Sequence, residues 1–207
     1  MYGKYFVKGL RSVTLATSSI LLLCSAAWAA PVTGGNTTVN LNAGTVSALV
    51  GLGFSVAPIA PATADLGATP PTAVFPIIGG DSTTNINHSG GLAFTKGGVT
   101  ADIQNFVINL AGANAGKLTG DLVAGGMTTN NVPFFDIGAG NSLTLDATLA
   151  AGLSSVYGIP NLTGTPIGTA VINASSAVPE PRDAALVGIG ILGVLALLRG
   201  RSAVSRA

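Results

Sequence analysis

Short apolar segments separated by turn-forming residues fill the middle of the chain. Between residues 38 and 173, Val, Ile and Leu recur at alternate positions, and Gly, Asn or Pro stands between the segments. Alternation with a period of two is typical of strands that bury one face. Gly90-Gly91 and Gly97-Gly98 supply the positive φ that tight hairpin turns require. The pattern predicts a mainly β, antiparallel domain of the sandwich-like type.

Two stretches with helical spacing interrupt the strand pattern. Asn42 precedes an apolar stripe that includes Val46 and Leu49, and Asp146 precedes ATLAAGLSSVYG, which ends near Gly158. Asn and Asp cap helices because their side-chain oxygens accept a backbone N–H of the first turn. Residues 39–51 and 143–155 also align without gaps, with Asn42 opposite Asp146. The sequence therefore predicts two short helices on a β-rich body, each following a strand and a cap.

Three segments of the body lack a regular pattern. Residues 30–37, APVTGGNT, predict a flexible leader. Prolines between Pro58 and Pro71 remove backbone donors, which predicts an edge segment or an extended loop. Residues 73–80, AVFPIIGG, predict a strand that ends in a Gly-Gly turn.

The N-terminal segment has the layout of a secretory signal peptide. Three basic residues precede an apolar stretch that closes on Ala27-Trp28-Ala29, which places cleavage after Ala29. An uncleaved N-terminal anchor is the alternative. The single cysteine, Cys24, lies inside the removed segment, so the mature chain has no disulfide and no cysteine metal site.

The C-terminal segment combines prolines, an apolar run and arginines. Pro179, Glu180 and Pro181 precede residues 184–198, which would form roughly 22 Å of helix at 1.5 Å per residue. That length is short for a hydrocarbon core of about 30 Å, which favours a transient membrane anchor over a permanent one. Arg199, Arg201 and Arg206 would keep the chain end on the cytoplasmic side.

These patterns divide the chain into six regions. They are a signal peptide (1–29), a leader (30–37), a β-rich extracellular domain (38–173), a linker with the Pro-Glu-Pro motif (174–183), a single transmembrane helix (184–198) and a basic cytoplasmic tail (199–207). The segment from 30 to 177 contains two lysines and six aspartates, so the body is acidic. Nucleic-acid binding needs clustered basic residues, and this absence excludes that class of partner.

His88 is the only candidate for site chemistry that the body offers. It is the single histidine, so one chain has no two-histidine metal site. Adjacent residues of a strand point to opposite faces, which argues against Ser89 and His88 as nucleophile and base. Two interpretations remain, a histidine held by a backbone hydrogen bond and a ligand or cofactor contact. The six dispersed aspartates are expected on solvent faces or helix caps, and the sequence predicts no catalytic residue, no metal site and no enzymatic activity.

The tail resembles a known sorting signal. Val178-Pro179-Glu180-Pro181, the apolar segment and the three arginines together are similar to the PEP-CTERM signal of Gram-negative bacteria. The resemblance implies export through the Sec translocon and signal peptidase, then an inner-membrane-anchored precursor that an exosortase processes near Pro-Glu-Pro. It also implies a final place at the cell surface or in the extracellular matrix. We therefore expect a structural or adhesive component of exopolysaccharide or biofilm.

The body resembles a second family. FPIIGG, INHSGGLAF, GVTADIQNFVI, GKLTGDL and LTLDATLAAGL, within residues 39–172, look like a secreted bacterial β-domain of the HtaA type. That resemblance implies a haem- or small-ligand-binding module, because domains of this type bind haem through a tyrosine with a nearby histidine. His88 falls on the histidine position, whereas Tyr157, the only tyrosine after residue 29, does not match the tyrosine. No cofactor is predicted, and a haem contact at His88 is the alternative.

Overall fold

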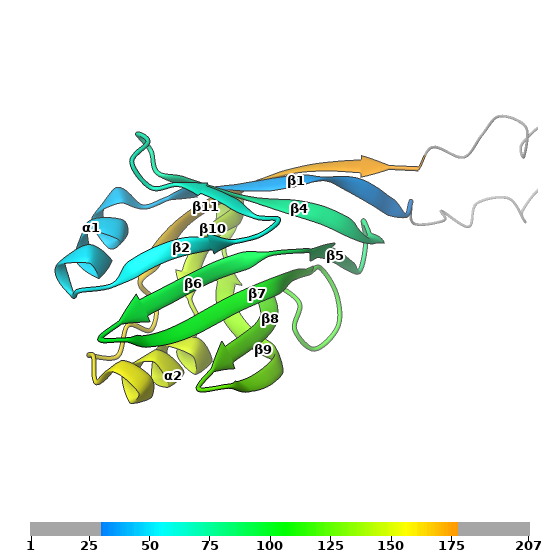
Figure 1. Cartoon of the computed structure of the whole chain (residues 1–207). Helices are drawn as coiled ribbons and strands as arrows, with labels where there is room; N and C mark the ends of the chain where they lie inside the picture. The colour runs from blue at the N-terminus through cyan, green and yellow to red at the C-terminus, as the bar shows by residue number, and fades with distance from the viewer. Residues whose placement is uncertain (1–29, 178–207) are drawn as a thin grey trace, which may run out of the picture.

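The computed structural model describes residues 30–177, in which eleven strands form one antiparallel sheet (Figure 1). The strands are β1 (Val32–Leu41), β2 (Ser55–Ile59), β3 (Thr63–Asp65), β4 (Thr72–Asp81), β5 (Asn85–His88), β6 (Gly91–Lys96), β7 (Val99–Asn109), β8 (Lys117–Ala124), β9 (Met127–Ile137), β10 (Ser142–Leu145) and β11 (Pro166–Ser176). The predicted signal peptide, sorting motif, anchor and basic tail lie outside the described residues.

The sheet closes on itself as an eight-stranded barrel. Its strands follow the order β7, β5, β4, β1, β11, β10, β9 and β8, and pairing of β7 with β8 completes the ring. Strand β6 pairs with β7, β2 pairs with β6, and β3 pairs with β4 at the margin of the barrel. The predicted mainly β, antiparallel domain is confirmed. The sandwich-like arrangement is wrong, because the β7–β8 pairing joins the two ends of the path into one closed layer.

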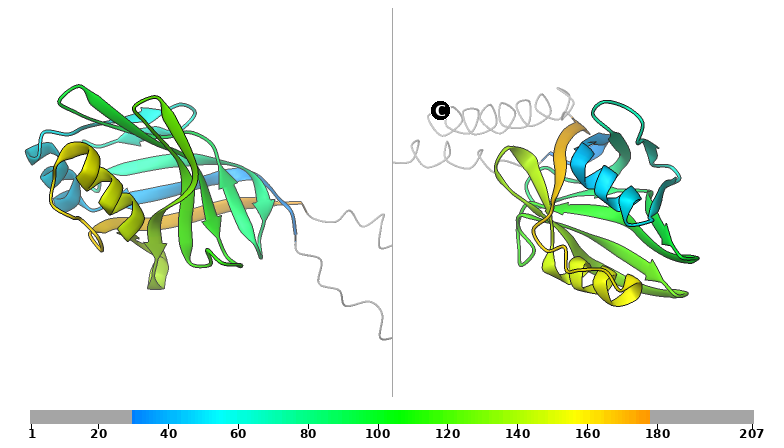
Figure 2. Two further views of the ribbon diagram at one scale, coloured as in Figure 1. Left: turned by 90° about the horizontal axis from the view of Figure 1, so that it is seen from below. Right: turned by 90° about the vertical axis from the view of Figure 1, so that its left-hand side faces the viewer.

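Two helices are present, as predicted, and both lie at one end of the barrel. Helix α1 (Ala43–Gly51) and helix α2 (Ala147–Tyr157) stand on opposite sides of that end in the right-hand view of Figure 2. The Asn42 side chain accepts the Thr45 N–H at 3.0 Å, and the Asp146 side chain accepts the Thr148 N–H at 2.7 Å. Both predicted caps are confirmed. Neither α-helix in residues 30–177 has the length and apolar character needed to cross a bilayer.

The core fills the barrel interior with aromatic and branched side chains. Phe106 packs edge-to-face against Phe75 and Phe134, with ring centroids 4.8 Å and 5.8 Å apart. On β7 the inward positions change parity, because Ile103 and Phe106 are both buried although they are three residues apart. A bulge at Asn105, where φ is +54°, takes up the extra residue. Within residues 30–177 the buried apolar side chains form one continuous cluster, which is what a segment able to fold by itself requires.

Strand β1 begins earlier than the sequence predicts. Residues 32–37, expected as a flexible leader, pair with β11 on one side, and residues 36–40 pair with β4 on the other. Burial of Val32 and Thr37 explains why this segment is a strand. Its partner β11 runs to Ser176, and the Ala177 N–H donates to the Pro31 carbonyl at 3.0 Å. Both ends of the described chain therefore leave from one place, opposite the helices (Figure 1).

The glycine pairs do not all make the predicted turns. Gly97-Gly98, with φ of +59° and +80°, forms the hairpin between β6 and β7 as predicted. Gly90 instead separates β5 from β6, which pair one after the other with the same strand β7. At Gly90 a Cβ atom would lie 2.5 Å from the Ala62 nitrogen, so only glycine fits there. Strand β4 likewise runs through Gly79-Gly80 to Asp81 before it turns. The proline-bearing strand β2 is an edge strand, as predicted.

Candidate functional site

A cavity of about 400 Å³ lies between the two helices and the barrel. Its walls come from α1, α2, β2, β6 and the segment around residues 159–167. Seventeen of its twenty lining residues are apolar, and the other three are Thr45, Ser55 and Thr165. No charged side chain lines the cavity. Cavities of 300 to 1,000 Å³ with mostly apolar walls are typical of sites for small organic ligands.

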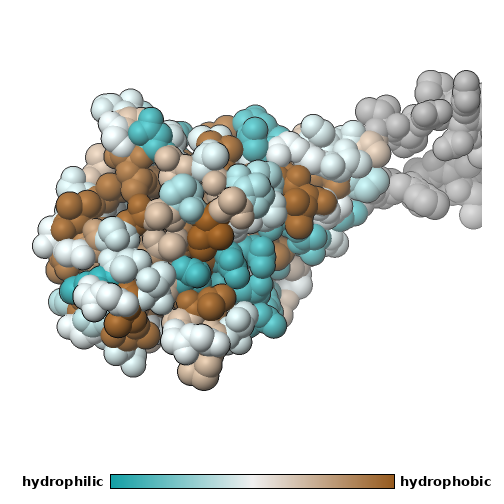
Figure 3. All heavy atoms as spheres, in the orientation of Figure 1, coloured by the Kyte–Doolittle hydropathy of each residue, from teal (hydrophilic) through white to brown (hydrophobic). Residues whose placement is uncertain are grey.

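The cavity extends from the buried core toward the surface at α1. Its deepest residues include Ile103 and Leu149, whose exposed fractions are 1% and 2%. Helix α1 contributes Val46, Leu49 and Val50, and it has no buried residue at all. Val50 is 64% exposed. Figure 3 shows hydrophobic residues gathered at the end of the molecule where Figure 1 places α1. Helix α1 therefore forms an outer cover of the cavity.

Few hydrogen-bonding groups face this space. The Thr45 hydroxyl, one of three in the lining, donates to the Pro166 carbonyl at 2.6 Å. A buried water typically needs two to four polar partners. The lining offers too few such groups for a cluster of ordered water to fill 400 Å³. The cavity is chemically suited to an apolar molecule.

Three side chains meet at the end of the cavity near the β6–β7 hairpin. The Phe54 ring, which lines the cavity, packs edge-to-face against Tyr157 with centroids 4.9 Å apart. The Lys96 Nζ lies 5.3 Å from the Phe54 ring centroid, within the range of a cation–π contact. The Tyr157 hydroxyl donates to the Phe94 carbonyl at 2.8 Å, and burial raises the pKa of this tyrosine. A cation thus stands beside a wall that is otherwise apolar.

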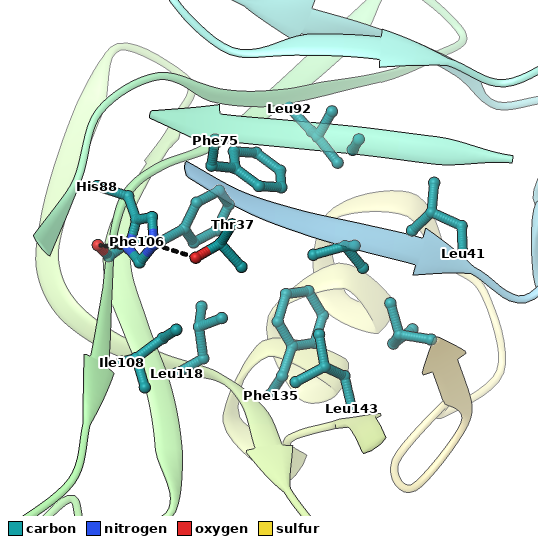
Figure 4. A pocket seen from close by; sticks show the side chains of 13 residues that line it. Thr37, Leu41, Phe75, His88, Leu92, Phe106, Ile108, Leu118, Phe135 and Leu143 are labelled. Carbon is teal, nitrogen blue, oxygen red and sulfur yellow. Dashed lines mark hydrogen bonds between the residues drawn. The ribbon is translucent and has the colours of Figure 1, made fainter. Parts of the chain in front are cut away.

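His88 lies inside the barrel, away from the large cavity. It is 3% exposed, and Figure 4 shows it next to Thr37 and Phe106. Its Nδ1 is 3.2 Å from the Phe106 carbonyl, which can only accept, so Nδ1 carries the proton. Nε2, 2.7 Å from the Thr37 hydroxyl, consequently accepts from it. Burial lowers the pKa of His88, in agreement with this neutral tautomer.

Haem does not fit at His88. The Nε2 lone pair that would bind iron already accepts the Thr37 hydroxyl proton. The cavity beside the ring measures only about 40 Å³. The geometry matches the interpretation of a histidine held by a backbone hydrogen bond, although His88 lies at the end of a strand and not in a hairpin turn. His88 thus provides hydrogen-bond partners for the Thr37 hydroxyl and the Phe106 carbonyl inside the barrel.

A charge cluster that the sequence pattern did not predict joins the ends of three strands to α2. The Lys117 Nζ lies 2.6 Å from a carboxylate oxygen of Asp136 and 2.6 Å from one of Asp146. These hydrogen bonds raise the pKa of Lys117. Burial acts to raise the pKa of Asp146, but the bonds from Lys117 and Thr148 outweigh it and lower that pKa. The single positive charge of the lysine offsets one of the two negative carboxylate charges, and the cluster anchors the start of α2.

Of the site residues that the sequence predicts, His88 alone lies in the described segment. The signal-cleavage residues Ala27 and Ala29, the sorting motif Val178 to Pro181 and the three arginines lie outside it. Within residues 30–177, no three His, Cys, Asp or Glu side chains come together as a metal site. Sequence reasoning missed the cavity, and the apolar stripe of α1 was the signal that could have indicated it.

Comparison with known proteins gives no match to a family model, to a curated protein or to a solved structure.

Proposed function

We propose that this chain is an exported, non-enzymatic surface protein whose barrel holds a small apolar ligand. The observation that carries the proposal is the cavity of about 400 Å³ between α1, α2 and the barrel. An enzyme would need reacting groups in this space, and the lining supplies only three hydroxyl groups. A binding role needs no more than shape and apolar surface, which the lining provides.

The size of the cavity gives an energetic reason for a ligand. The side chains around an unfilled apolar space have no contact partners on one side, so they lose the dispersion energy that such contacts would supply. A bound apolar molecule would offset much of this loss by restoring contacts to the walls. The domain would then be more stable with its ligand than without it.

We also propose that the sorting signal delivers this module to the cell surface or the extracellular matrix. The chain enters and leaves the barrel at one end, where Pro31 and Ala177 are hydrogen-bonded. Both helices line the cavity, and Figure 1 shows these helices at the other end of the barrel. A tether at residues 178–207 would thus hold the cavity away from the membrane. An exosortase could process Pro179-Glu180-Pro181 without disturbing the barrel, and the released domain would join the exopolysaccharide.

Binding can be tested with the isolated domain and a neutral probe. We expect residues 30–177 to bind tetradecan-1-ol, and ligand at a hundred times its Kd raises the free energy of unfolding by about 2.7 kcal/mol. Val46→Phe should abolish this stabilisation because the larger ring enters the cavity. Val171→Phe is the matched control, since Val171 is exposed on β11 and does not line the cavity. Denaturant unfolding with and without alcohol measures both, and an unstabilised wild-type domain would overturn the binding role.

Sorting can be tested in the source cell. Replacing Pro179, Glu180 and Pro181 together by alanine should leave uncleaved precursor in the inner membrane. Asp183→Ala, just outside the motif, is the control and should be processed normally. Cell fractionation and the mass of the released chain provide the measurement. Normal surface release of the triple variant would contradict the sorting proposal and would leave the binding proposal intact.

A further inference from the structure

We propose that the ligand is a single-chain amphiphile with a carboxylate head, which Lys96 binds at the end of the cavity. This inference rests on the proposed binding function and specifies its ligand class. The hydrocarbon chain would occupy the apolar space, and the head would lie beside the Phe54 ring. The position of Lys96, its lack of an ion pair in the described segment and the size of the cavity all lead to this class of ligand.

The position of Lys96 follows from the alternation of β6. Leu92 and Phe94 both line the cavity, and side chains two residues apart on a strand point to the same face. Lys96 is the next residue of that series. Its Nζ lies 5.3 Å from the ring centroid of Phe54, which also lines the cavity. The ammonium group therefore stands where the apolar wall ends.

The charges of the domain single out the same lysine. Residues 30–177 contain two cationic side chains, Lys96 and Lys117. Lys117 is already held by Asp136 and Asp146 at 2.6 Å each. Lys96 forms no ion pair with any residue between 30 and 177. The described domain thus contains one cationic side chain available to an anionic ligand, and this side chain stands at the apolar cavity.

The lining decides where the charge of such a ligand must lie. The cavity has no charged side chain, and an unpaired carboxylate in an apolar interior carries a large desolvation cost. The head must therefore remain at the rim, beside Lys96. An apolar cavity of 150 Å³ is known to hold benzene, and scaling by volume gives about 16 non-hydrogen atoms for this cavity. Tetradecanoic acid has about that size.

The decisive experiment compares an acid with the alcohol of the same chain length. Binding of tetradecanoic acid and tetradecan-1-ol to residues 30–177 is measured by calorimetry at neutral pH, for the wild type, Lys96→Gln and Lys96→Arg. We expect the wild type to bind the acid more tightly. Lys96→Gln should weaken acid binding about tenfold, the size of one charge-assisted hydrogen bond, and leave alcohol binding unchanged. Lys96→Arg should retain the preference for the acid.

Each result separates the inference from the function on which it rests. Equal acid binding by wild type and Lys96→Gln, with alcohol bound by both, would overturn the carboxylate assignment and keep the apolar binding role. Equal loss of acid and alcohol binding in Lys96→Gln would also overturn it, since Lys96 would then only shape the Phe54 wall. Failure of the wild type to bind either probe would overturn the binding role itself. Weaker acid binding at higher salt, with constant alcohol binding, would support the ion pair.

Discussion

Helices α1 and α2 begin in the same way and end up in different environments. Each follows a strand, and each starts at an Asx cap whose side chain accepts a backbone N–H. Helix α2 buries Leu149 and Ala150, and its cap Asp146 is 5% exposed. Helix α1 buries no residue, and its cap Asn42 is exposed. Local sequence thus fixes where a helix starts, whereas tertiary contacts decide whether it belongs to the core.

One aligned pair of residues shows the physical difference. In the gapless alignment of the two segments, Thr45 of α1 stands opposite Leu149 of α2. Leu149 packs into the core cluster, while the Thr45 hydroxyl donates to the Pro166 carbonyl. Helix α2 is therefore held by apolar burial, and α1 by a hydrogen bond at its first turn. A helix held in this second way covers the cavity without being part of the buried core.

The largest difference between the helices should appear when a leucine is truncated in each. Leu149→Ala should lower the free energy of unfolding by about 3 kcal/mol, because it removes a fully buried side chain and enlarges a cavity. Leu49→Ala should cost about 1 kcal/mol, since Leu49 is only half-buried. Urea unfolding of both variants measures the difference. Equal costs would show that α1 is as much a part of the core as α2.

The second largest difference should be in the stability that the two helix caps contribute. Asp146→Ala should cost about 2 kcal/mol, because it removes a cap and one of the two carboxylates bound to Lys117. Asn42→Ala should cost about 1 kcal/mol, the value of an ordinary exposed cap. Folding lowers the pKa of Asp146, so its contribution is present above its ordinary pKa of 3.8 and is lost as the pH falls below that value. The Asp146→Ala variant should therefore lose less stability on acidification than Asn42→Ala does.

Acidification from pH 7 to pH 5 should lower the free energy of unfolding through His88, which belongs to the barrel and to neither helix. Burial lowers the pKa of His88 below its ordinary 6.5, so the unfolded chain binds a proton first as the pH falls. The contribution of His88 to the free energy of unfolding is complete above about pH 6.5. Below that pH it decreases by at most about 1.4 kcal/mol for each pH unit. His88→Gln should give a flat profile in this window. A wild-type slope that persists in His88→Gln would assign the titration to another group.

The features that the sequence predicted are those with local causes. Asn42, Asp146 and Gly158 act within a few residues of their own helix, and the Gly97-Gly98 turn is set by its own backbone. Barrel closure depends on pairing of β7 with β8, together with the pairing of strands far apart in the chain, such as β1 with β11. Alternation gives a strand its two faces and does not tell which strand will be its neighbour. A barrel and a sandwich therefore have the same sequence pattern.

Sequence reasoning identified one candidate residue, His88, which lies outside the cavity, and it missed the cavity itself. His88 was identified by its uniqueness, but its partner Thr37 lies 51 residues away in the sequence, so its satisfied state could not be inferred. The cavity has no polar signature, because its lining residues are those of any core. Its only trace is that α1 has the apolar stripe of a packed helix without becoming buried. The stripe can be read from the sequence, whereas the lack of burial is visible only in the structure.

The smallest effect on stability should accompany the clearest effect on ligand exchange. Thr45→Val keeps the shape of the side chain and removes the hydrogen bond that ties α1 to Pro166. The freed Pro166 carbonyl is exposed and can bind water, so we expect a loss below about 1 kcal/mol. That energy corresponds to about fivefold more frequent opening of α1, and both the association and the dissociation rate of tetradecan-1-ol should rise by this factor. Stopped-flow displacement measures the rates, with Thr165→Val as the control because Thr165 lines the cavity outside α1. Unchanged rates in Thr45→Val would mean that the ligand enters elsewhere and that α1 is a fixed wall.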